Sequence, residues 1–255
     1  EKLGDASIDT DVLLSMNKKK LDINIEGNVP YLTLNNYQYN DLNINGLLSD
    51  QIFKGKFTLN DPNAKIKFNG EVNYREAKPI LAFEMKVNDL NLSKIGFAQT
   101  NRDLEISTHI KTDIKGNIDD FWTGRILIDS LKIKDSSKVN YDINDIILTS
   151  TQNNGVSNMS VKSSIADIDL SMNGLLNLNE LKNIKNYITT TLKEDSLFKY
   201  PYQSVKLNVL AKNTEVVSKL IQKNIYLSRG SSVDLSLNKD TLPSGKIKAD
   251  SLIYN

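Results

Sequence analysis

Apolar and polar residues alternate along Lys65–Tyr74, where every second residue is apolar or glycine. Because successive side chains of a strand point to opposite faces, this stretch predicts a β-strand with one apolar and one polar face. The same five-residue motif, apolar-polar-apolar-polar-glycine, recurs at Ile23–Gly27, Leu42–Gly46 and Leu170–Gly174. It also recurs at Thr112–Gly116, where threonine takes the first apolar position. In each motif the glycine falls on the apolar face. One pattern reused along a chain predicts a repeat architecture of strands.

Turn signals separate the alternating stretches. Asn60-Asp61-Pro62-Asn63 predicts a type I turn within a hairpin loop of about five residues. Asn154-Gly155 predicts a tight hairpin, and the change of phase at Asp129-Ser130 predicts a bulge or turn. The connections are mostly short and lack crossover helices, so neighbouring strands should pair antiparallel. Sheets of more than about ten strands must curl or close.

The predicted fold is therefore mainly β, a curved and mostly antiparallel sheet that forms an open apolar groove with two short helices. Leu181, Ile184, Ile188 and Leu192 follow helical spacing, with Asn179 as the expected N-cap. We expect a repeating β-groove over residues 1–178, a helical insert over 179–195, and a continuing groove over 196–255 with a short helix at about 214–222. Around Leu90, Leu92, Ile95 and Phe97 the alternation breaks, which predicts an irregular helical turn or a plug.

The apolar positions of the central strands share one phase, so they should line one continuous surface. This expected groove, the candidate lipid-binding site, comprises Ile66, Phe68, Gly70, Val72, Leu81, Phe83, Met85, Val87, Leu104, Ile106, Ile110, Ile114, Leu170 and Met172. Inward glycines such as Gly70 and Gly116, together with inward Thr108 and Thr112, predict an interior that is not filled to core density. A closed barrel or sandwich filled with its own side chains is the other shape that the pattern allows.

Composition narrows the possible chemistry. The 255 residues include 32 basic and 31 acidic side chains, interspersed rather than clustered, which argues against a nucleic-acid surface. There is no cysteine, which excludes disulfides, thiolate metal sites and cysteine nucleophiles. No apolar run approaches the roughly 18 to 20 residues of a membrane span. The chain begins at Glu1 without methionine, so we expect a mature or excised piece of a longer protein.

The sequence shows no recognisable catalytic or cofactor motif. His109 is the only histidine and alternates onto the polar face of its strand, where we expect it to be inert. Asp61 and the pair Asp119-Asp120 lack the spaced oxygen ligands of a calcium loop, so turn and cap roles are expected. Trp122 is expected to anchor a strand end, with membrane-interface contact as the alternative. We therefore predict no enzyme activity, no cofactor and no metal, although scattered acids leave a glycosidase-like carboxylate pair open.

Four sequence segments, in this order along the chain, resemble segments of one known family. They are Phe53-Lys54-Gly55 with Asp61-Pro62-Asn63 and Phe68-Asn69-Gly70; Asp113–Asn117 followed by Phe121 and Gly124; Ser163–Asp167 with Gly174 and the stretch Leu178–Leu192; and Asn213–Leu220 with Ile225-Tyr226-Leu227 and Gly230. Together they resemble TamB, the translocation and assembly module subunit, as it occurs in Bacteroidetes. This family belongs to the AsmA-like group of bridge-like lipid-transfer proteins, and the resemblance covers residues 53–237.

The resemblance implies a periplasmic, taco-shaped β-groove with no catalytic residues. It implies an inner-membrane tether and an outer-membrane barrel partner, both engaged through regions absent from this chain, which would be a middle segment. The ligand it implies is the acyl chain of a phospholipid, carried between the inner and outer membranes during outer-membrane biogenesis and protein assembly. Two other functions stay open: a structural or adhesin-type β-repeat with a solid core and no lipid ligand, and an undetected carbohydrate-active enzyme.

Overall fold

The computed structural model describes residues 3–17, 20–96, 104–117, 121–135, 140–194, 200, 203–213, 215, 225–249 and 252–254. The chain divides into two compact units, one formed by Glu1–Ile114 with Leu127–Asn144 and the other by Lys115–Ile126 with Asp145–Asn255. We call them unit 1 and unit 2. The predicted helix at 214–222 (residue 215 excepted), Phe97 and Asp119-Asp120 lie outside the described residues.

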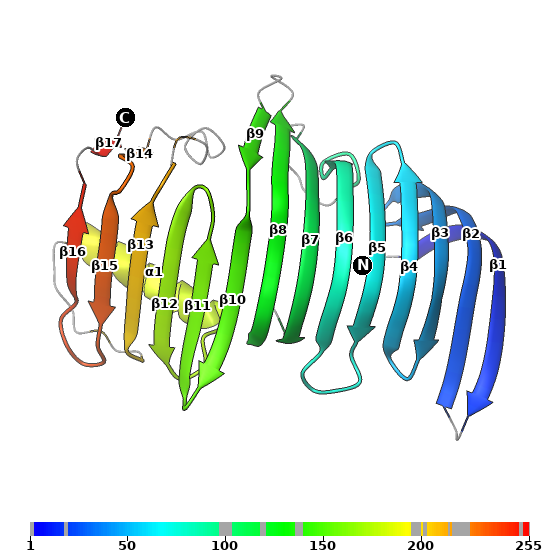
Figure 1. The fold of residues 1–255 in the computed structure, drawn as a ribbon, viewed down its shortest axis with the longest axis horizontal. Coiled ribbons are helices and arrows are strands. Elements are labelled where there is room, and N and C mark those ends of the chain that lie inside the picture. The colour runs from blue at the N-terminus through cyan, green and yellow to red at the C-terminus, as the bar shows by residue number, and fades with distance from the viewer. Residues whose placement is uncertain are drawn as a thin grey trace. The chain divides into compact units, whose positions relative to one another are not determined.

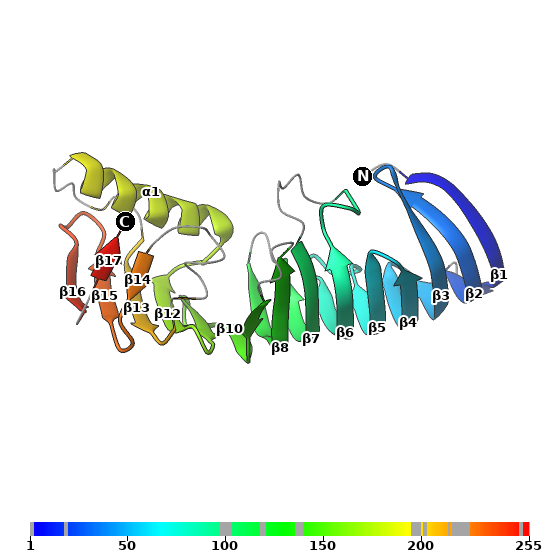
Figure 2. The same cartoon turned by 90° about the horizontal axis from the view of Figure 1, so that it is seen from above.

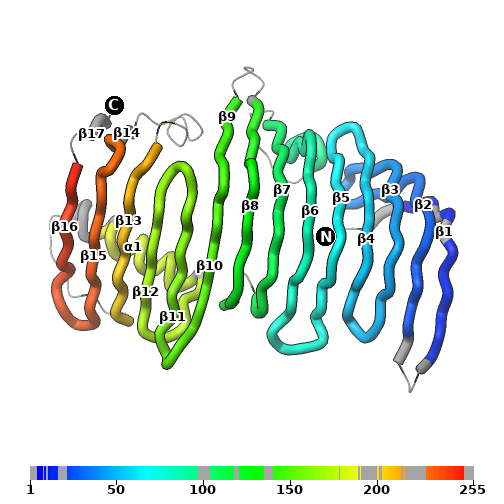
Figure 3. The backbone as a smooth tube through the Cα atoms, viewed as in Figure 1, coloured from blue at the N-terminus to red at the C-terminus, as the bar shows by residue number. Residues whose placement is uncertain are grey.

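Antiparallel strands make up most of both units (Figures 1 and 3). The first strands are β1 (Leu3–Asn17), β2 (Lys20–Leu34), β3 (Tyr37–Ser49), β4 (Ile52–Asp61), β5 (Ala64–Asn73), β6 (Ile80–Asn91), β7 (Leu104–Gly116), β8 (Trp122–Asp135) and β9 (Asn140–Ile143). Next come β10 (Ile146–Asn153), β11 (Val156–Lys162), β12 (Ala166–Asn173), α1 (Leu178–Glu194), β13 (Val205–Ala211), β14 (Ile225–Leu227), β15 (Ser232–Leu237), β16 (Ser244–Lys248) and β17 (Leu252–Tyr254).

The strands pair almost entirely in chain order. The main sheet has 15 strands in the order β1 to β8, then β10, β11, β12, β13, β15 and β16, with β9 paired to β8 outside this path. The short strands β14 and β17 form a separate pair. In unit 1 the long strands β1, β2 and β3 sweep in arcs rather than running flat (Figure 2). The predicted fold class, a mainly β, curved and antiparallel sheet, is confirmed.

Several local predictions are confirmed by the backbone. Asn154 and Gly155, with φ of 50° and 76°, close the hairpin between β10 and β11. Ser130, with a φ of 50°, interrupts the otherwise continuous strand β8, as expected for a bulge. Ile95 lies in a turn in which its amide donates to Asn91 O at 3.2 Å, and its side chain is buried. The expected irregular turn after β6 is therefore present.

The hairpin between β4 and β5 is tighter than the sequence predicted. Asp61 pairs directly with Ala64, so the loop is Pro62-Asn63 rather than about five residues. The buried Asp61 carboxylate explains the difference, because it accepts hydrogen bonds from Tyr37 Oη at 2.5 Å and from the backbone amides of Asn40 and Asn63 at 3.1 and 2.9 Å. Burial, and then the neighbouring Asp61, raise the pKa of Tyr37 above its usual 10.0.

Helix α1, at Leu178–Glu194, confirms the helix that the spacing of Leu181, Ile184, Ile188 and Leu192 predicted. It begins one residue before the expected cap: Asn177 Oδ1 accepts the amide of Glu180 at 2.9 Å, so Asn177, not Asn179, is the N-cap. The helix contains Ile, Tyr, Asn and three consecutive threonines, which are modest helix formers. Its stability therefore depends on packing against the sheet.

Candidate functional site

The candidate site is the apolar face of β1–β6 in unit 1, and cross-strand register defines it. Cα partners in an antiparallel pair point their side chains to the same face. The pairings Ile44–Phe57, Phe57–Phe68 and Phe68–Met85 thus form one row across four strands. Other sets of cross-strand partners lie on the same face as this row. They comprise Val12, Leu14, Ile23, Ile25, Val29, Leu42, Leu48, Phe53, Leu59, Ile66, Val72, Leu81, Phe83 and Val87.

Four phenylalanines form the centre of this apolar face. The rings of Phe57 and Phe68 stack with centroids 4.9 Å apart and an interplanar angle of 9°. Phe83 lies 5.1 Å from Phe68 on one side, and Phe53 lies 6.2 Å from it on the other. Phe68 is consequently buried, with 7% of its surface exposed. The sequence placed Phe68 and Phe83 on one face, and the register confirms it.

A row of glycines crosses the same face. Gly46 pairs with Gly55, and Gly55 pairs with Gly70. A Cβ atom on Gly55 would lie 2.5 Å from the Cα of Gly46, and one on Gly70 would lie 2.4 Å from the Cα of Phe83. A Cβ on Gly46 would meet the ring of Phe53 at 2.8 Å. The glycines therefore permit close approach of neighbouring strands and, at Gly46, of the Phe53 ring. That Gly70 leaves room for a ligand stays a prediction.

Gly116 shows the same close approach. A Cβ there would lie 2.2 Å from Phe121 O, in the turn where the amide of Asn117 donates to that oxygen at 3.1 Å. Its φ of 119° is also unfavourable for a residue with a side chain. Gly116 is therefore required by this turn.

Most side chains of the apolar face are only half-buried, with Phe68, Val29 and Val87 as buried exceptions. At the β1 margin the face is exposed: Val12 keeps 49% of its surface accessible and Leu14 keeps 65%. A filled core of this length would bury these positions almost completely. One end is covered, where Ile95, Leu90 and Leu92 pack with Tyr39 and Ala64.

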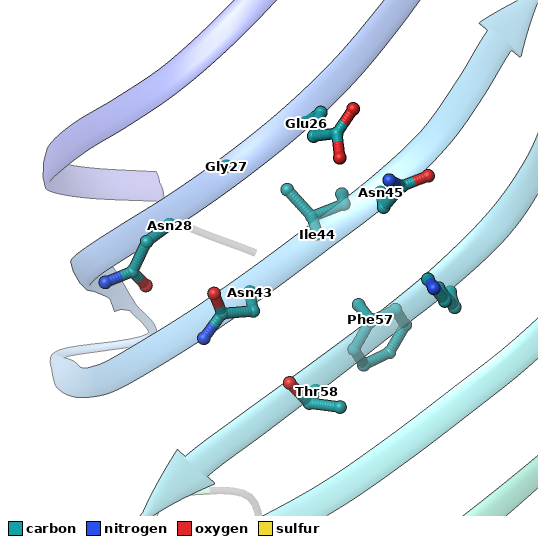
Figure 4. Close-up of a pocket in the computed structure, with 9 residues that line it drawn as sticks. Glu26, Gly27, Asn28, Asn43, Ile44, Asn45, Phe57 and Thr58 are labelled. Carbon is teal, nitrogen blue, oxygen red and sulfur yellow. The ribbon is translucent and has the colours of Figure 1, made fainter.

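The opposite face of these strands is polar. Its side chains are mainly lysine, asparagine, threonine and glutamate, with ion pairs such as Lys65–Asp89 at 3.1 Å and Lys54–Glu71 at 3.8 Å. A shallow hollow over β2, β3 and β4 is lined by Glu26, Asn28, Asn43, Asn45, Lys56 and Thr58 together with Gly27, Ile44 and Phe57 (Figure 4). Two further hollows contain Asp169 and Glu71. Each of the three hollows has one carboxylate, whereas a two-carboxylate glycosidase site needs a pair.

The residues of β7 that were expected to point inward occupy alternate positions of one strand, so their side chains lie on one face of the sheet. Leu104, Ile106 and Ile110 are half-buried, and Ile114 is buried with 1% exposed. Their neighbours Thr108 and Thr112 have hydroxyl oxygens that are buried and lack a hydrogen-bond partner among the described residues. An unpaired buried hydroxyl costs free energy, so these two threonines weaken this part of the sheet.

His109 has specific partners that the sequence did not reveal. Its Nε2 lies 2.5 Å from Glu84 Oε1 on β6, and its Nδ1 lies 3.7 Å from Asp129 Oδ2 on β8. The hydrogen bond from His109, and secondarily Lys111, lower the pKa of the Glu84 carboxyl. The histidine therefore connects three strands on the polar face. Alternation predicted the face, but only the pairing of β6, β7 and β8 brings the carboxylates to it.

Leu170 and Met172 lie in unit 2, in a packed core rather than on an open face. They are buried, with 6% and 1% exposed, in a cluster that comprises Leu170, Met172, Leu176, Ile184, Tyr200, Val205 and Leu237. Helix α1 provides Ile184, and its residues Leu181, Tyr187 and Ile188 pack against the cluster. The sequence predicted both the strand β12 and the helix but not that one covers the other.

Trp122 is the first residue of β8 and is buried, with 6% exposed. Its carbonyl accepts a hydrogen bond from Ser150 Oγ at 2.7 Å. The expected strand-end anchor is confirmed. Because the side chain is buried, it is not placed for contact with a membrane interface.

Among the described residues no group of three or more His, Cys, Asp or Glu side chains could hold a metal ion. None of the helices in that part of the chain combines the length and the apolar character needed to cross a bilayer. Comparisons with known proteins identify no relative. No family model, no curated protein and no solved structure matches this chain.

Proposed function

We propose that the apolar face of β1–β6 binds acyl chains, and that the protein is a non-catalytic segment of a conduit for phospholipid. The observation that supports this function most is the half-buried state of the apolar face. Eighteen register-matched apolar positions run across six strands, and few of them are buried. Contiguous apolar surface that is left accessible to water marks a binding surface.

An acyl chain suits this face because it needs no polar partner there. Burial of a methylene gains about 0.8 kcal/mol, so some sixteen methylenes gain on the order of 10 kcal/mol. That gain offsets the cost of association and of leaving the bilayer. The phenyl rings around Phe68 offer flat apolar contacts, while the lysines and asparagines of the opposite face keep the sheet hydrated. The headgroup would remain in water.

The resemblance to the TamB family suggests where such a conduit would act. We propose a periplasmic location, with transfer between inner and outer membranes and a role in outer-membrane biogenesis. The inner-membrane tether and the outer-membrane barrel partner would engage regions outside this chain. The support here is the match of fold class, a curved antiparallel sheet, with what the resemblance implies.

Photo-crosslinking tests the proposal directly. A benzoylphenylalanine probe at Phe83, on the apolar face, should crosslink to phospholipid in cells, and the same probe at Lys86, on the opposite face of β6, should not. A charge placed elsewhere in the row, as in Ile44→Asp, should abolish the crosslink at Phe83 because a tail would have to pass a desolvated ion. Thermal unfolding verifies that the variant is folded. Absence of lipid crosslinks from every apolar position, or equal crosslinking from Lys86, would disprove the conduit.

Unit 2 favours a second candidate function, that of a structural β-repeat with a solid core. Its apolar face is covered by α1, and Met172, Val205 and Leu237 have at most 2% of their surface exposed. If the whole protein were such a module, organic extracts of the purified chain would contain no stoichiometric lipid. Mass spectrometry of those extracts separates the two functions.

A further inference from the structure

The apolar face of β4–β6 has a closed end and an open end along the direction of its strands. At the closed end the turn at residues 92–96 packs Ile95 against Ala64, and these side chains are 3% and 0% exposed. At the open end the loop between β5 and β6 begins with Tyr74, which is 57% exposed, and residues 75–78 are exposed as well. A molecule that lies along these strands therefore meets protein at one end and water at the other.

The closed end is held by hydrogen bonds as well as by packing. The amide of Asn91 donates to Asn63 O at 2.9 Å, which connects the turn to the hairpin between β4 and β5. Asn91 Oδ1 accepts the hydroxyl of Ser93 at 2.9 Å and the amide of Lys94 at 3.1 Å. Asn91 itself is only 2% exposed. The turn that carries Ile95 is therefore anchored to the end of the sheet.

A buried carboxylate lies immediately beyond the closed end. Asp61 follows Leu59 by two residues on β4 and pairs with Ala64, so alternation places it on the apolar face. It is 0% exposed, and its Oδ1 accepts hydrogen bonds from Tyr37 Oη and from the amide of Asn63. An acyl chain has no donor to replace these bonds, so displacing them would be costly. The apolar surface therefore ends at the level of Ile95.

The stretch of apolar face between the two ends has the same length on three strands. Two rows of cross-strand partners bound it, Leu59, Ile66 and Val87 beside the closed end and Phe53, Val72 and Leu81 beside the open end. The two rows are six residues apart on each strand, which is about 20 Å at about 3.3 Å per residue. An extended hydrocarbon advances about 1.25 Å for each C–C bond of about 1.5 Å, so about sixteen carbons fill this length.

We propose that Ile95 sets the maximum length of the acyl chain, and that the apolar face of β4–β6 takes saturated chains of up to about sixteen carbons. The inference rests on the proposed function, the binding of acyl chains to this face. The chain lies along the strands with its methyl end against Ile95 and Leu59. Its headgroup lies near Tyr74, because a charged group must stay in water and the open end is the exposed one.

A series of saturated lysophosphatidylglycerols tests this limit in the unmutated 255-residue chain, by displacement of a pyrene-labelled fatty acid. A buried methylene tightens binding up to about fourfold, so affinity should rise steeply from about twelve to about sixteen carbons. From about sixteen to about eighteen carbons it should change less than about twofold, because the added carbons find no apolar surface. A steady rise through about twenty carbons would overturn the limit and support acyl-chain binding. No binding at any length would overturn both.

Shortening Ile95 should move the limit. In Ile95→Ala the chain of about eighteen carbons should bind at least about fourfold tighter than that of sixteen, and that of twenty no tighter than eighteen, because Asp61 remains. The control Ile143→Ala removes the same atoms from a 5% exposed position on β9 of unit 1 and should leave the limit unchanged. Thermal unfolding verifies that both variants are folded. A folded Ile95→Ala variant with an unchanged limit would overturn the proposal.

Labelling from the two ends of a fatty acid of about sixteen carbons needs no mutation and decides the orientation. A diazirine at the methyl end should label Leu59, Ile66 or Val87, and a diazirine beside the carboxyl group should label Phe53, Val72 or Leu81. Mass spectrometry of the peptides locates the labels. Reversed labelling, or the same labels from both probes, would overturn the proposal whether or not Ile95→Ala folds.

Discussion

The apolar faces of units 1 and 2 share one alternating pattern but differ in what covers them. In unit 1 the face of β1–β6 has nothing packed over most of it among the described residues, and residues such as Phe83 and Met85 stay half-buried. In unit 2 the equivalent positions Leu170 and Met172 are buried beneath α1. The same motif, apolar-polar-apolar-polar-glycine, therefore specifies a strand and its apolar face. It does not specify whether other residues pack over that face.

The cover in unit 2 is a local addition to the chain rather than a property of its strands. Helix α1 is inserted between the neighbouring strands β12 and β13, which still pair directly from Met172–Val205 to Ala166–Ala211. Its apolar residues Leu181, Ile184 and Ile188 supply the packing that the open face lacks. In unit 2 a helix placed between two paired strands thus packs over the sheet face and forms part of its core.

The largest expected effect contrasts one methionine from each unit. Met172→Lys places a charge in a closed core and should reduce the free energy of unfolding by about 4 kcal/mol. Met85→Lys should cost only about 1 kcal/mol, because a half-exposed lysine can extend its ammonium to water. Urea denaturation compares the two variants. Equal losses would mean that the face in unit 1 is a filled core after all.

Removing the cover should make unit 2 resemble unit 1. Ile184→Ala truncates a buried residue of α1 and should cost about 3 kcal/mol. Because the sheet face beneath becomes accessible, binding of an apolar fluorescent dye should rise as well. Lys182→Ala, on the exposed side of the same helix, is the control and should alter stability by less than about 0.5 kcal/mol. A dye signal unchanged by Ile184→Ala would count against α1 as the cover.

The third contrast concerns glycines. Gly70→Ala in unit 1 should cost about 2 to 3 kcal/mol, since the added Cβ meets backbone atoms of Ala82 and Phe83 and the φ of 157° is unfavourable. Gly155→Ala, in a hairpin of unit 2 with nothing within 4 Å, should cost about 1 kcal/mol from its φ of 76° alone. Thermal denaturation measures both. If Gly70→Ala is the milder change, the strands do not approach closely at this row.

The smallest effect is a pH-dependent ion pair in unit 2. Lys212 Nζ lies 2.6 Å from Asp167 Oδ1, and this hydrogen bond lowers the pKa of the Asp167 carboxyl. A lowered carboxyl pKa stabilises the fold above the unfolded pKa of about 3.9, and the contribution disappears as the pH falls through the folded value. Asp167→Asn should cost about 0.5 kcal/mol at pH 7, because the pair is partly exposed, and nothing near pH 2. A cost that is unchanged at pH 2 would assign it to packing.

Local sequence signals predicted much of the fold. Asn154-Gly155 specified its hairpin because few residues other than Asn and Gly adopt positive φ at low cost. The phase change at Ser130 marked its bulge, and the apolar spacing from Leu181 to Ile188 marked α1. These predictions needed only backbone preferences and alternation. The N-cap was displaced to Asn177 because two asparagines flank the first helical residue, and either can cap.

What the sequence did not predict depends on strand pairing. The partners of His109 come from Glu84 and Asp129, far away in the chain, and no local pattern indicates them. The close approach at Gly55 and Gly70 arises only once those residues are in register across two strands. The buried Asp61 could have been suspected from its position before Pro62, but its contacts with Tyr37 and Asn40 required the β3–β4 pairing.

The near-perfect agreement between strand order and chain order has a consequence for how such a sheet changes in length. Each strand of the main path bonds only to the strands beside it, so stability is nearly a sum of neighbouring terms. Strands can then be gained or lost in hairpin pairs, which keep both the direction of the next strand and the side on which its apolar residues lie. The width of the sheet is therefore proportional to the length of the polypeptide. Each added hairpin widens the sheet by about 10 Å, which is two strand spacings.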